Sequence, residues 1–297
     1  MAPAAPDSGL GPWRWTLHRP VEEEPIWEGL LWEEVPGQWN LQGNPKQKRI
    51  LIEVVFEDRA AAEAWQSVHG GNIEALAPPE EWFVPAPIPP PIRIRDRFLV
   101  TSETDDERIE ELRAANPDRE LLIVPAEMAF GTGTHPTTRT CLRLLCDAAR
   151  PLQREGRPWR CLDLGCGSAI LSIAARKLGA EVVRAVEIDR VALNYAERNA
   201  RRNGVRGIEF VEADLLADES AFADGPWDIV LANIFSNILR PIFPPIRRAL
   251  GAGGILLYSG ILRAHEKEVR TAALAAGFSD PDTVRIGKWV TGRCRCR

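Results

Sequence analysis

The chain has 297 residues, of which 45 % are hydrophobic and 27 % are charged, a composition typical of a globular protein that buries a core. Its formal net charge of -5 provides no broad basic surface for a phosphate backbone, so direct binding to nucleic acid is not favoured. No apolar stretch approaches the roughly 20 residues that a membrane-spanning helix needs.

Two further features bear on where the protein acts. Residues 1–11 are rich in Ala and Pro but lack a basic segment followed by an apolar one, so they do not form a secretory signal. The six cysteines are scattered, and several stand inside apolar runs, where a small buried thiol is the simplest interpretation. We therefore expect a cytoplasmic protein.

The first part of the chain predicts a small α+β unit, which we place at residues 12–84. Segments with strand-like alternation are interleaved with helix-forming segments. The strands are expected at 13–18, 49–56 and 72–77, and the helices at 22–34 and 60–68. The order β-α-β-β-α-β fits a ferredoxin-like module.

A proline run follows this unit and predicts a break between domains. Such a run cannot donate ladder hydrogen bonds and stays extended. Its members are Pro85, Pro87, Pro89, Pro90 and Pro91. We interpret residues 85–120 as a linker and entrance segment, in which a strand at 97–101 and a helix at 105–115 precede a strand at 121–124.

The remainder, residues 121–297, alternates strands and helices. The expected strands are 160–164, 182–187, 208–211, 228–232, 255–259 and 284–290, and the expected helices are 168–178, 190–203, 236–250 and 264–276. Repeated βα units predict an α/β fold with a largely parallel sheet covered by helices on both faces. Ligands bind such sheets at the carboxyl ends of the strands.

A Gly-rich turn, Asp163–Ala169, links the first of these strands to its helix. Gly165 and Gly167 permit backbone angles that let a ligand approach the main chain closely. Taken alone, the turn is also explained as a tight connection without a ligand. Ile170 stands where the dinucleotide fingerprint has a third small residue, which disfavours a nicotinamide cofactor. Asp163 suits a cationic ligand, such as the ammonium of a methionyl group.

Polar residues follow the next strands. Glu187, about 20 residues after the turn, can accept hydrogen bonds from both hydroxyls of a ribose, whereas Asp189 is better placed to cap the next helix. Asp214 can bond an adenine amino group, and a plain loop aspartate is an equally good interpretation. Asn233 ends an apolar strand, and its carbonyl can accept a bond from a nucleophilic amine.

The segment Met128–Thr138 holds two glycines, four threonines and a histidine just before a helix. Such a loop suits closure over a ligand. The alternative is a capped helix entry, with Thr137 or Thr138 satisfying free backbone N–H groups. His135 has no partner at metal-site spacing, so we expect no metal.

Taken together, these motifs resemble the ribosomal protein L11 methyltransferases, the PrmA family. The resemblance spans roughly residues 121–290 and is looser before Pro91. It rests on Met128–Thr138, Asp163–Ser168, Glu187–Asp189, Asn203–Val205, Ala232–Ile234 and Ser259–Leu262.

The resemblance implies a Rossmann-like class I methyltransferase behind a small substrate-recognition domain. Its cofactor would be S-adenosylmethionine, and its substrate the lysine side-chain and N-terminal amines of ribosomal protein L11, a stalk-base protein of the large subunit. The family's cofactor contacts fall on Thr138, Gly165, Glu187 and Asn233. To these we add Gly167 and Asp214, with Asn233 also as the catalytic residue, and we expect a monomer.

Three departures from the family pattern stand out. Ala169 replaces the usual third glycine of the turn, Glu187 stands where Asp is common, and the proline run and the tail Arg293–Arg297 are unfamiliar. Three alternatives therefore stay open: a lysine methyltransferase for another protein, a non-catalytic S-adenosylmethionine-binding protein, and a nicotinamide oxidoreductase. The loop, the acids and Asn233 together argue against the second.

Methyl transfer is an in-line displacement, so the protein needs to align the amine and exclude water, and no covalent nucleophile is required. The amine has to be neutral, although a free lysine with a pKa near 10.4 is almost wholly protonated at pH 7. We expect desolvation to lower that pKa and Asn233 to orient the amine, without a dedicated general base.

Overall fold

A computed structural model describes residues 12–35, 38–44, 48–76, 88–125, 133 and 135–296. The chain divides into two compact units, Met1–Pro87 and Ile88–Arg297. Each unit has a hydrophobic core of its own. Among the described residues, no helix combines the length and the apolar character that crossing a membrane requires.

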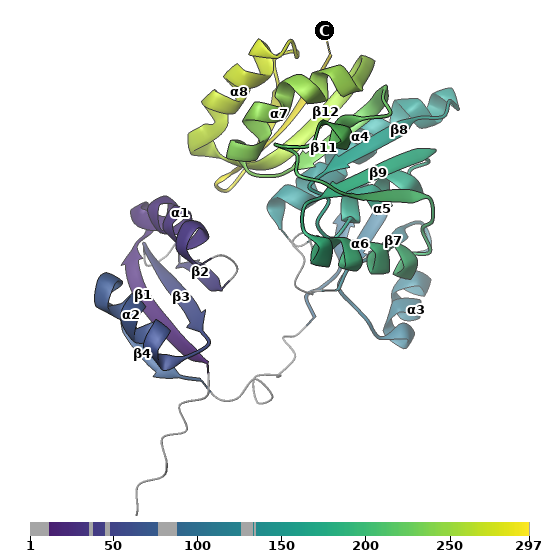
Figure 1. Ribbon diagram of the computed structural model, residues 1–297. Coiled ribbons are helices and arrows are strands. Elements are labelled where there is room, and N and C mark those ends of the chain that lie inside the picture. Colours follow the sequence, from purple (N-terminus) through teal and green to yellow (C-terminus); the bar gives the residue numbers. More distant parts are fainter. Residues whose placement is uncertain are drawn as a thin grey trace, which may run out of the picture. The chain divides into compact units, whose positions relative to one another are not determined.

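The first unit is a four-stranded antiparallel sheet with two main helices (Figure 1). Its strand order, β2-β3-β1-β4, is that of the expected ferredoxin-like module. Its elements are β1 (Trp13–Pro20), the 3-10 turn η1 (Val21–Glu23), α1 (Glu24–Glu34), β2 (Trp39–Asn44), β3 (Arg49–Phe56), α2 (Arg59–His69) and β4 (Asn72–Ala75).

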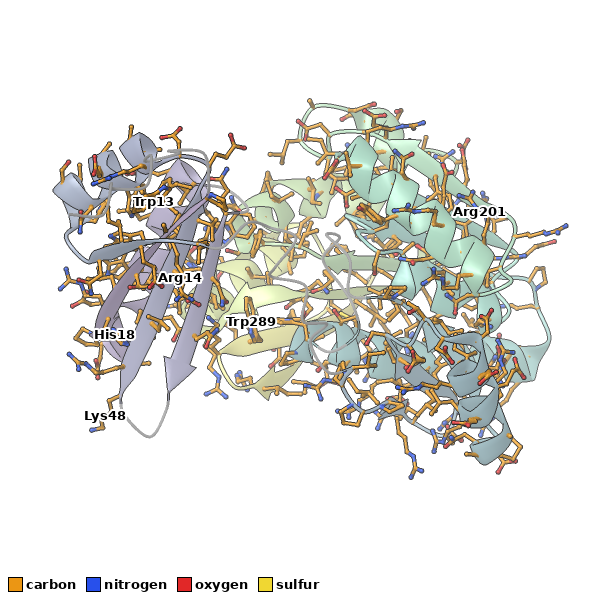
Figure 2. All side chains as sticks on the ribbon, turned by 90° about the horizontal axis from the view of Figure 1, so that it is seen from below. Trp13, Arg14, His18, Lys48, Arg201 and Trp289 are labelled. Atoms are coloured by element: carbon orange, nitrogen blue, oxygen red, sulfur yellow. The ribbon has the colours of Figure 1, made fainter. Side chains whose placement is uncertain are left out.

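The alternation of side chains along the strands explains this sheet. On β1, Trp13 and Trp15 pack into the core, whereas Arg14 points to the other face and bonds Glu74 and Glu53 (Figure 2). The core side includes Trp65, whose ring lies 6.0 Å from that of Trp15. The strand β2 has no counterpart among the strands located from sequence, because its six residues offer only a short alternation.

The second unit contains a seven-stranded sheet and a separate three-stranded sheet. Its elements are β5 (Ile92–Ile94), β6 (Phe98–Thr101), α3 (Asp106–Ala115), β7 (Glu120–Ile123), α4 (Pro136–Glu155), β8 (Arg160–Leu164), α5 (Ile170–Lys177), β9 (Val182–Glu187), α6 (Arg190–Arg202), β10 (Ile208–Glu212), η3 (Glu219–Phe222), β11 (Trp227–Asn233), α7 (Ser236–Ala249), β12 (Leu250–Leu262), η4 (Arg263–His265), α8 (Glu266–Ala275), β13 (Asp282–Ile286) and β14 (Trp289–Arg295).

The large sheet has the order β10-β9-β8-β11-β12-β14-β13, and β14 is antiparallel to both of its neighbours. The other pairings are parallel, which agrees with the alternating βα pattern. The three-stranded sheet has the order β5-β6-β7. Residues 88–120, which we interpreted from sequence as part of a linker and entrance segment, contribute β5, β6 and α3 to the second unit.

The prediction of a single last strand at 284–290 is wrong. The chain forms a hairpin there, in which β13 and β14 pair antiparallel around Gly287 and Lys288. Gly287 adopts a φ of +57°, the left-handed conformation that a tight turn requires and that glycine adopts without strain. Because apolar residues stand on both sides of this turn, the sequence resembles one continuous strand.

Both faces of the large sheet are buried, as Figure 1 illustrates with the helices around it. On β11, Ile229 and Leu231 face the cluster that includes α4, α5 and α6, while Val230 and Ala232 face the cluster that includes α7 and α8. Each buried Ile or Leu stabilises the fold by about 1.5–3 kcal/mol. The same alternation directs the next residue, Asn233, toward the α4 side.

Candidate cofactor site

The Gly-rich turn follows β8 and is fastened to the neighbouring strand β9. The backbone N–H groups of Gly165 and Cys166 donate to the carbonyl of Val186 at 2.8 and 3.0 Å. Gly165 has a φ of +69°, and a Cβ at this position would lie 2.4 Å from Cγ2 of Ile234. Both the backbone angle and the packing therefore require glycine here.

The turn ends on a strained residue. Ala169 precedes α5 with a φ of +60°, the left-handed conformation, and is fully buried. This conformation costs a residue with a side chain about 1–2 kcal/mol. The N–H of Ala169 donates to the carbonyl of Cys166 at 2.8 Å. The surrounding contacts therefore have to hold the turn in this shape.

Glu187, at the end of β9, lies against the turn, as expected. Its Oε2 accepts the N–H of Gly167 at 3.0 Å, and its Oε1 accepts the N–H groups of Ile188 at 2.9 Å and Asp189 at 3.3 Å. These bonds fix the half-buried carboxylate, and Oε2, which accepts only one of them, retains acceptor capacity for a further donor. Asp189 caps α6, since its Oδ1 accepts the N–H of Val191 at 2.7 Å.

Asp163 lies beneath the turn rather than on its surface. Its side chain is buried, and its Oδ2 accepts the hydroxyl of Ser172 at 2.5 Å. Burial raises the pKa of this carboxyl to about 7, against the lowering effect of the bonds from Ser172. From this position Asp163 links the end of β8 to α5, beneath the turn.

Asp214 follows β10 and occupies a loop beside Glu187. The N–H of Ala213 donates to the carbonyl of Glu187 at 3.1 Å, which holds this loop at the end of β9. Oδ1 of Asp214 accepts the N–H of Leu216 at 2.8 Å. One carboxylate oxygen of Asp214 thus stabilises the loop, as a loop aspartate does. The other oxygen has no hydrogen bond of this kind to the described residues of the loop.

Asn233 and Thr138 come together across the α4 side of the sheet. Nδ2 of Asn233 lies 3.4 Å from Oγ1 of Thr138, which is fully buried in the first turn of α4. Oδ1 of Asn233 is buried and accepts no hydrogen bond from any residue that the structure describes. A buried acceptor without a donor costs about 1–3 kcal/mol, so this carbonyl suits a donor from a bound molecule.

The residue that caps α4 is His135, and not Thr137 or Thr138, the two residues that we weighed for this role as an alternative to a ligand loop. The N–H of Thr137 donates to Nδ1 of His135 at 3.3 Å, and the imidazole packs edge-on against Trp289 at 5.0 Å. Burial, followed by the nearby charges of Lys288 and Arg139, lowers the pKa of His135. The rest of the loop expected to cover the site, residues 128–132 and 134, lies outside the described residues.

Sequence reasoning missed a set of exposed apolar side chains near the carboxyl ends of β9, β10 and β11. They are Ile188, Val191, Leu216 and Phe235, which are 62, 56, 52 and 44 % exposed. Exposed large apolar groups at a strand-end edge are suited to a flat, apolar ligand surface. The signal available in the sequence was an apolar residue one or two positions after each polar strand-end residue, such as Ile188 after Glu187 and Phe235 after Asn233.

No group of three His, Cys, Asp or Glu side chains that could hold a metal occurs in the described part of the chain. The polar groups that the structure assembles at this edge of the sheet are backbone N–H groups, carboxylates and one amide.

Comparison with known proteins decides the family. The profile described as ribosomal protein L11 methyltransferase (PrmA) matches residues 87–296. The chain belongs to this family. The resemblance inferred from the motifs is thereby confirmed.

Individual relatives agree with the family profile. A ribosomal protein L11 methyltransferase of Bacillus cereus (strain B4264) is 36 % identical over 200 residues, 67 % of this chain and 60 % of the relative. One from Bacillus cytotoxicus is 35 % identical over the same shares. The match thus spans less than two thirds of these relatives.

A solved structure, the ribosomal protein L11 methylase from Lactobacillus delbrueckii subsp. bulgaricus, is similar with a TM-score of 0.57 and 27 % identity. The similarity covers 70 % of this chain and 100 % of that chain. The predicted fold class, a Rossmann-like α/β sheet with a small N-terminal α+β domain, is confirmed.

Proposed function

We propose that the protein transfers methyl groups from S-adenosylmethionine to amines of ribosomal protein L11, on lysine side chains and at the N-terminus. The observation that supports this most strongly is the buried Oδ1 of Asn233 beside the Gly-rich turn, which accepts no hydrogen bond from the described part of the chain, in a member of the L11 methyltransferase family. An acceptor at this position is suited to the N–H of an incoming amine.

The residues present fit the cofactor. Gly165 and Gly167 both have positive φ and no side chain, which lets a ligand approach the main chain closely, and Oε2 of Glu187 offers an acceptor for a ribose hydroxyl. The remaining oxygen of Asp214 would accept an adenine amino group, and Thr138 would support Asn233 and the cofactor from α4. When bound, S-adenosylmethionine supplies an electrophilic methyl group on a sulfonium.

The chain's own residues then align and desolvate the amine. Oδ1 of Asn233 would accept one N–H of the neutral amine and orient the nitrogen lone pair toward the methyl group. Holding the two reactants in this geometry accelerates the transfer. Burial lowers the pKa of a lysine amine from about 10.4, so the neutral form becomes accessible. We assign His135 a structural role at the start of α4, where its Nδ1 accepts the N–H of Thr137, and no role as a base.

For the identity of the substrate, there is a second candidate besides ribosomal protein L11. The family profile begins at residue 87, so the whole ferredoxin-like unit lies before the matched region. We assign substrate recognition to this unit. A lysine methyltransferase that acts on another protein is therefore the second candidate.

The six cysteines are all unpaired, which supports the reducing cytoplasm as the site of action. We also propose that the protein works as a monomer.

The substrate test uses purified large ribosomal subunits and free ribosomal protein L11. Each is incubated with the protein and isotope-labelled S-adenosylmethionine, and every protein is then weighed by mass spectrometry. Label on ribosomal protein L11 is the expected result. Label on a different protein would favour the second candidate, and S-adenosylmethionine binding without label would favour a non-catalytic role. Calorimetry with S-adenosylmethionine and with NAD distinguishes an oxidoreductase.

A further inference from the structure

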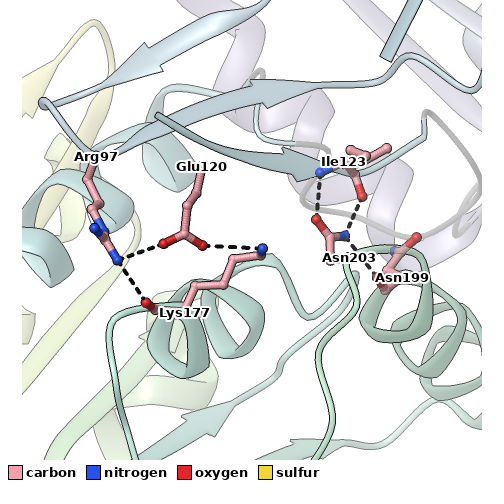
Figure 3. A network of polar contacts seen from close by, with 6 residues as sticks. All are labelled: Arg97, Glu120, Ile123, Lys177, Asn199 and Asn203. Atoms are coloured by element: carbon pink, nitrogen blue, oxygen red, sulfur yellow. Dashed lines mark hydrogen bonds and ion pairs between the residues drawn. The ribbon is translucent and has the colours of Figure 1, made fainter. Parts of the chain in front are cut away.

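Two buried asparagines, Asn199 of α6 and Asn203 at its C-terminal cap, connect the three-stranded sheet to the Gly-rich turn. Figure 3 shows the part of this connection that joins Ile123 to the two asparagines. Asn203 pairs with both backbone groups of Ile123, the last residue of β7. Its Oδ1 accepts the N–H of Ile123 at 2.9 Å, and its Nδ2 donates to the carbonyl of Ile123 at 2.7 Å. The carboxamide thus occupies the place of a neighbouring strand at this edge of the sheet.

The connection continues to the turn. Nδ2 of Asn203 also donates to the carbonyl of Asn199 at 2.8 Å, and the N–H of Asn203 donates to the same carbonyl at 3.0 Å. The side chain of Asn199 then donates from Nδ2 to the carbonyl of Ser168 at 3.1 Å. Asn199, Asn203 and Ser168 are 6, 8 and 1 % exposed, so water does not compete for these bonds.

The bond from Asn199 acts where the turn is strained. The carbonyl of Ser168 lies between the N–H of Gly167, which Glu187 holds, and Ala169, which has a positive φ. Glu187 therefore fastens one side of this peptide segment and Asn199 the other. If the bond from Asn199 is lost, Ala169 can relax toward an ordinary conformation and turn the N–H groups of the turn away from the site.

We propose that Asn199 and Asn203 are positioning residues, which hold the Gly-rich turn in its cofactor-binding shape and link that shape to β7. This inference rests on the proposed function, namely that the turn binds S-adenosylmethionine. Neither asparagine has to contact the cofactor. They act through the carbonyl of Ser168 and through Ile123.

A second link, between the same small sheet and the helix α5, provides a matched control. Glu120, on β7, accepts bonds from Arg97 at 2.7 Å and from Lys177 at 3.4 Å, and Arg97 also donates to the carbonyl of Lys177 at 3.1 Å (Figure 3). This network joins the sheet to the far end of α5 and does not reach the turn. Breaking it loosens the sheet without releasing the carbonyl of Ser168.

The test compares Asn199→Ala, Asn203→Ala and Glu120→Ala. We expect Asn199→Ala to raise the Kd and the KM for S-adenosylmethionine about tenfold, the effect of one lost buried hydrogen bond. The KM for the protein substrate should not change. Asn203→Ala should act in the same direction and less strongly. Glu120→Ala should lower the Tm and leave the Kd at the parental value.

A parental Kd in folded Asn199→Ala, or an equal loss of affinity in Glu120→Ala, overturns the proposal. If Asn199→Ala does not fold, hydrogen exchange of the unmodified protein tests the link between the turn and β7. The amide of Ile123 should exchange more slowly when S-adenosylmethionine is added, because coupling between two sites is reciprocal; unchanged exchange overturns the link. If the unmodified protein binds no S-adenosylmethionine, the proposed function fails instead.

Discussion

Replacing Gly165 with Ala adds one methyl group at a point where the backbone and the packing both oppose it. The φ of +69° costs a residue with a side chain about 1–2 kcal/mol. The new Cβ would also lie 2.4 Å from Cγ2 of Ile234, and overpacking of this kind costs about 1–3 kcal/mol. We expect a loss of about 3 kcal/mol and a fall in Tm of roughly 6–12 °C for a unit of this size.

Gly156→Ala is the control for this substitution. Gly156 ends α4 with a φ of +63°, and an added Cβ there would meet nothing within 4 Å. This variant therefore has the backbone cost alone, about 1–2 kcal/mol, and should bind S-adenosylmethionine normally. Thermal unfolding and calorimetry measure both variants. If Gly165→Ala is no less stable than Gly156→Ala and binds the cofactor with the parental Kd, the reasoning about the turn is refuted.

Three further predictions concern single side chains. Asn233→Ala should lower kcat about a hundredfold in steady-state assays, because the amine loses its orienting acceptor; an unchanged kcat and Kd would remove Asn233 from the mechanism. Glu187→Gln should weaken S-adenosylmethionine binding about tenfold or more by calorimetry, since bonds to a charged acceptor are stronger, whereas parental affinity would exclude the ribose role. His135 has a lowered pKa in the folded state, so the unfolded chain binds more protons below about pH 6.5, and stability should fall as the pH decreases from there. Denaturant unfolding at pH 7.5 and pH 5.5 should show a smaller decrease for His135→Asn, and an equal decrease in both proteins would contradict the assignment.

Much of the large sheet follows from local patterns in the sequence. Strands that are buried on both faces, such as β8 and β11, are short apolar runs, and polar residues end them at the edge where ligands bind. This is why Glu187 and Asn233 could be selected before their surroundings were known. The capping role of Asp189 could also be predicted, because this residue stands one position before a helix.

Features that depend on contacts between residues far apart in the chain could not be predicted from local sequence patterns. The burial of Asp163 and its bond from Ser172 depend on how α5 packs beneath the turn. The capping of α4 by His135 replaced the threonine caps that propensity favours, because the imidazole is also held against Trp289. The pairing of Asn203 with Ile123 spans 80 positions, and no periodicity records such a contact.

The most direct test of the account is methyl transfer to purified ribosomal protein L11 under single-turnover conditions, followed by intact-mass and peptide mass spectrometry. The account predicts added methyl groups on lysine or N-terminal amines with the unmodified protein, and a strongly slowed reaction with Asn233→Ala at saturating S-adenosylmethionine. Unmodified ribosomal protein L11 in a reaction where the protein binds S-adenosylmethionine, or equal rates for both proteins, would contradict it.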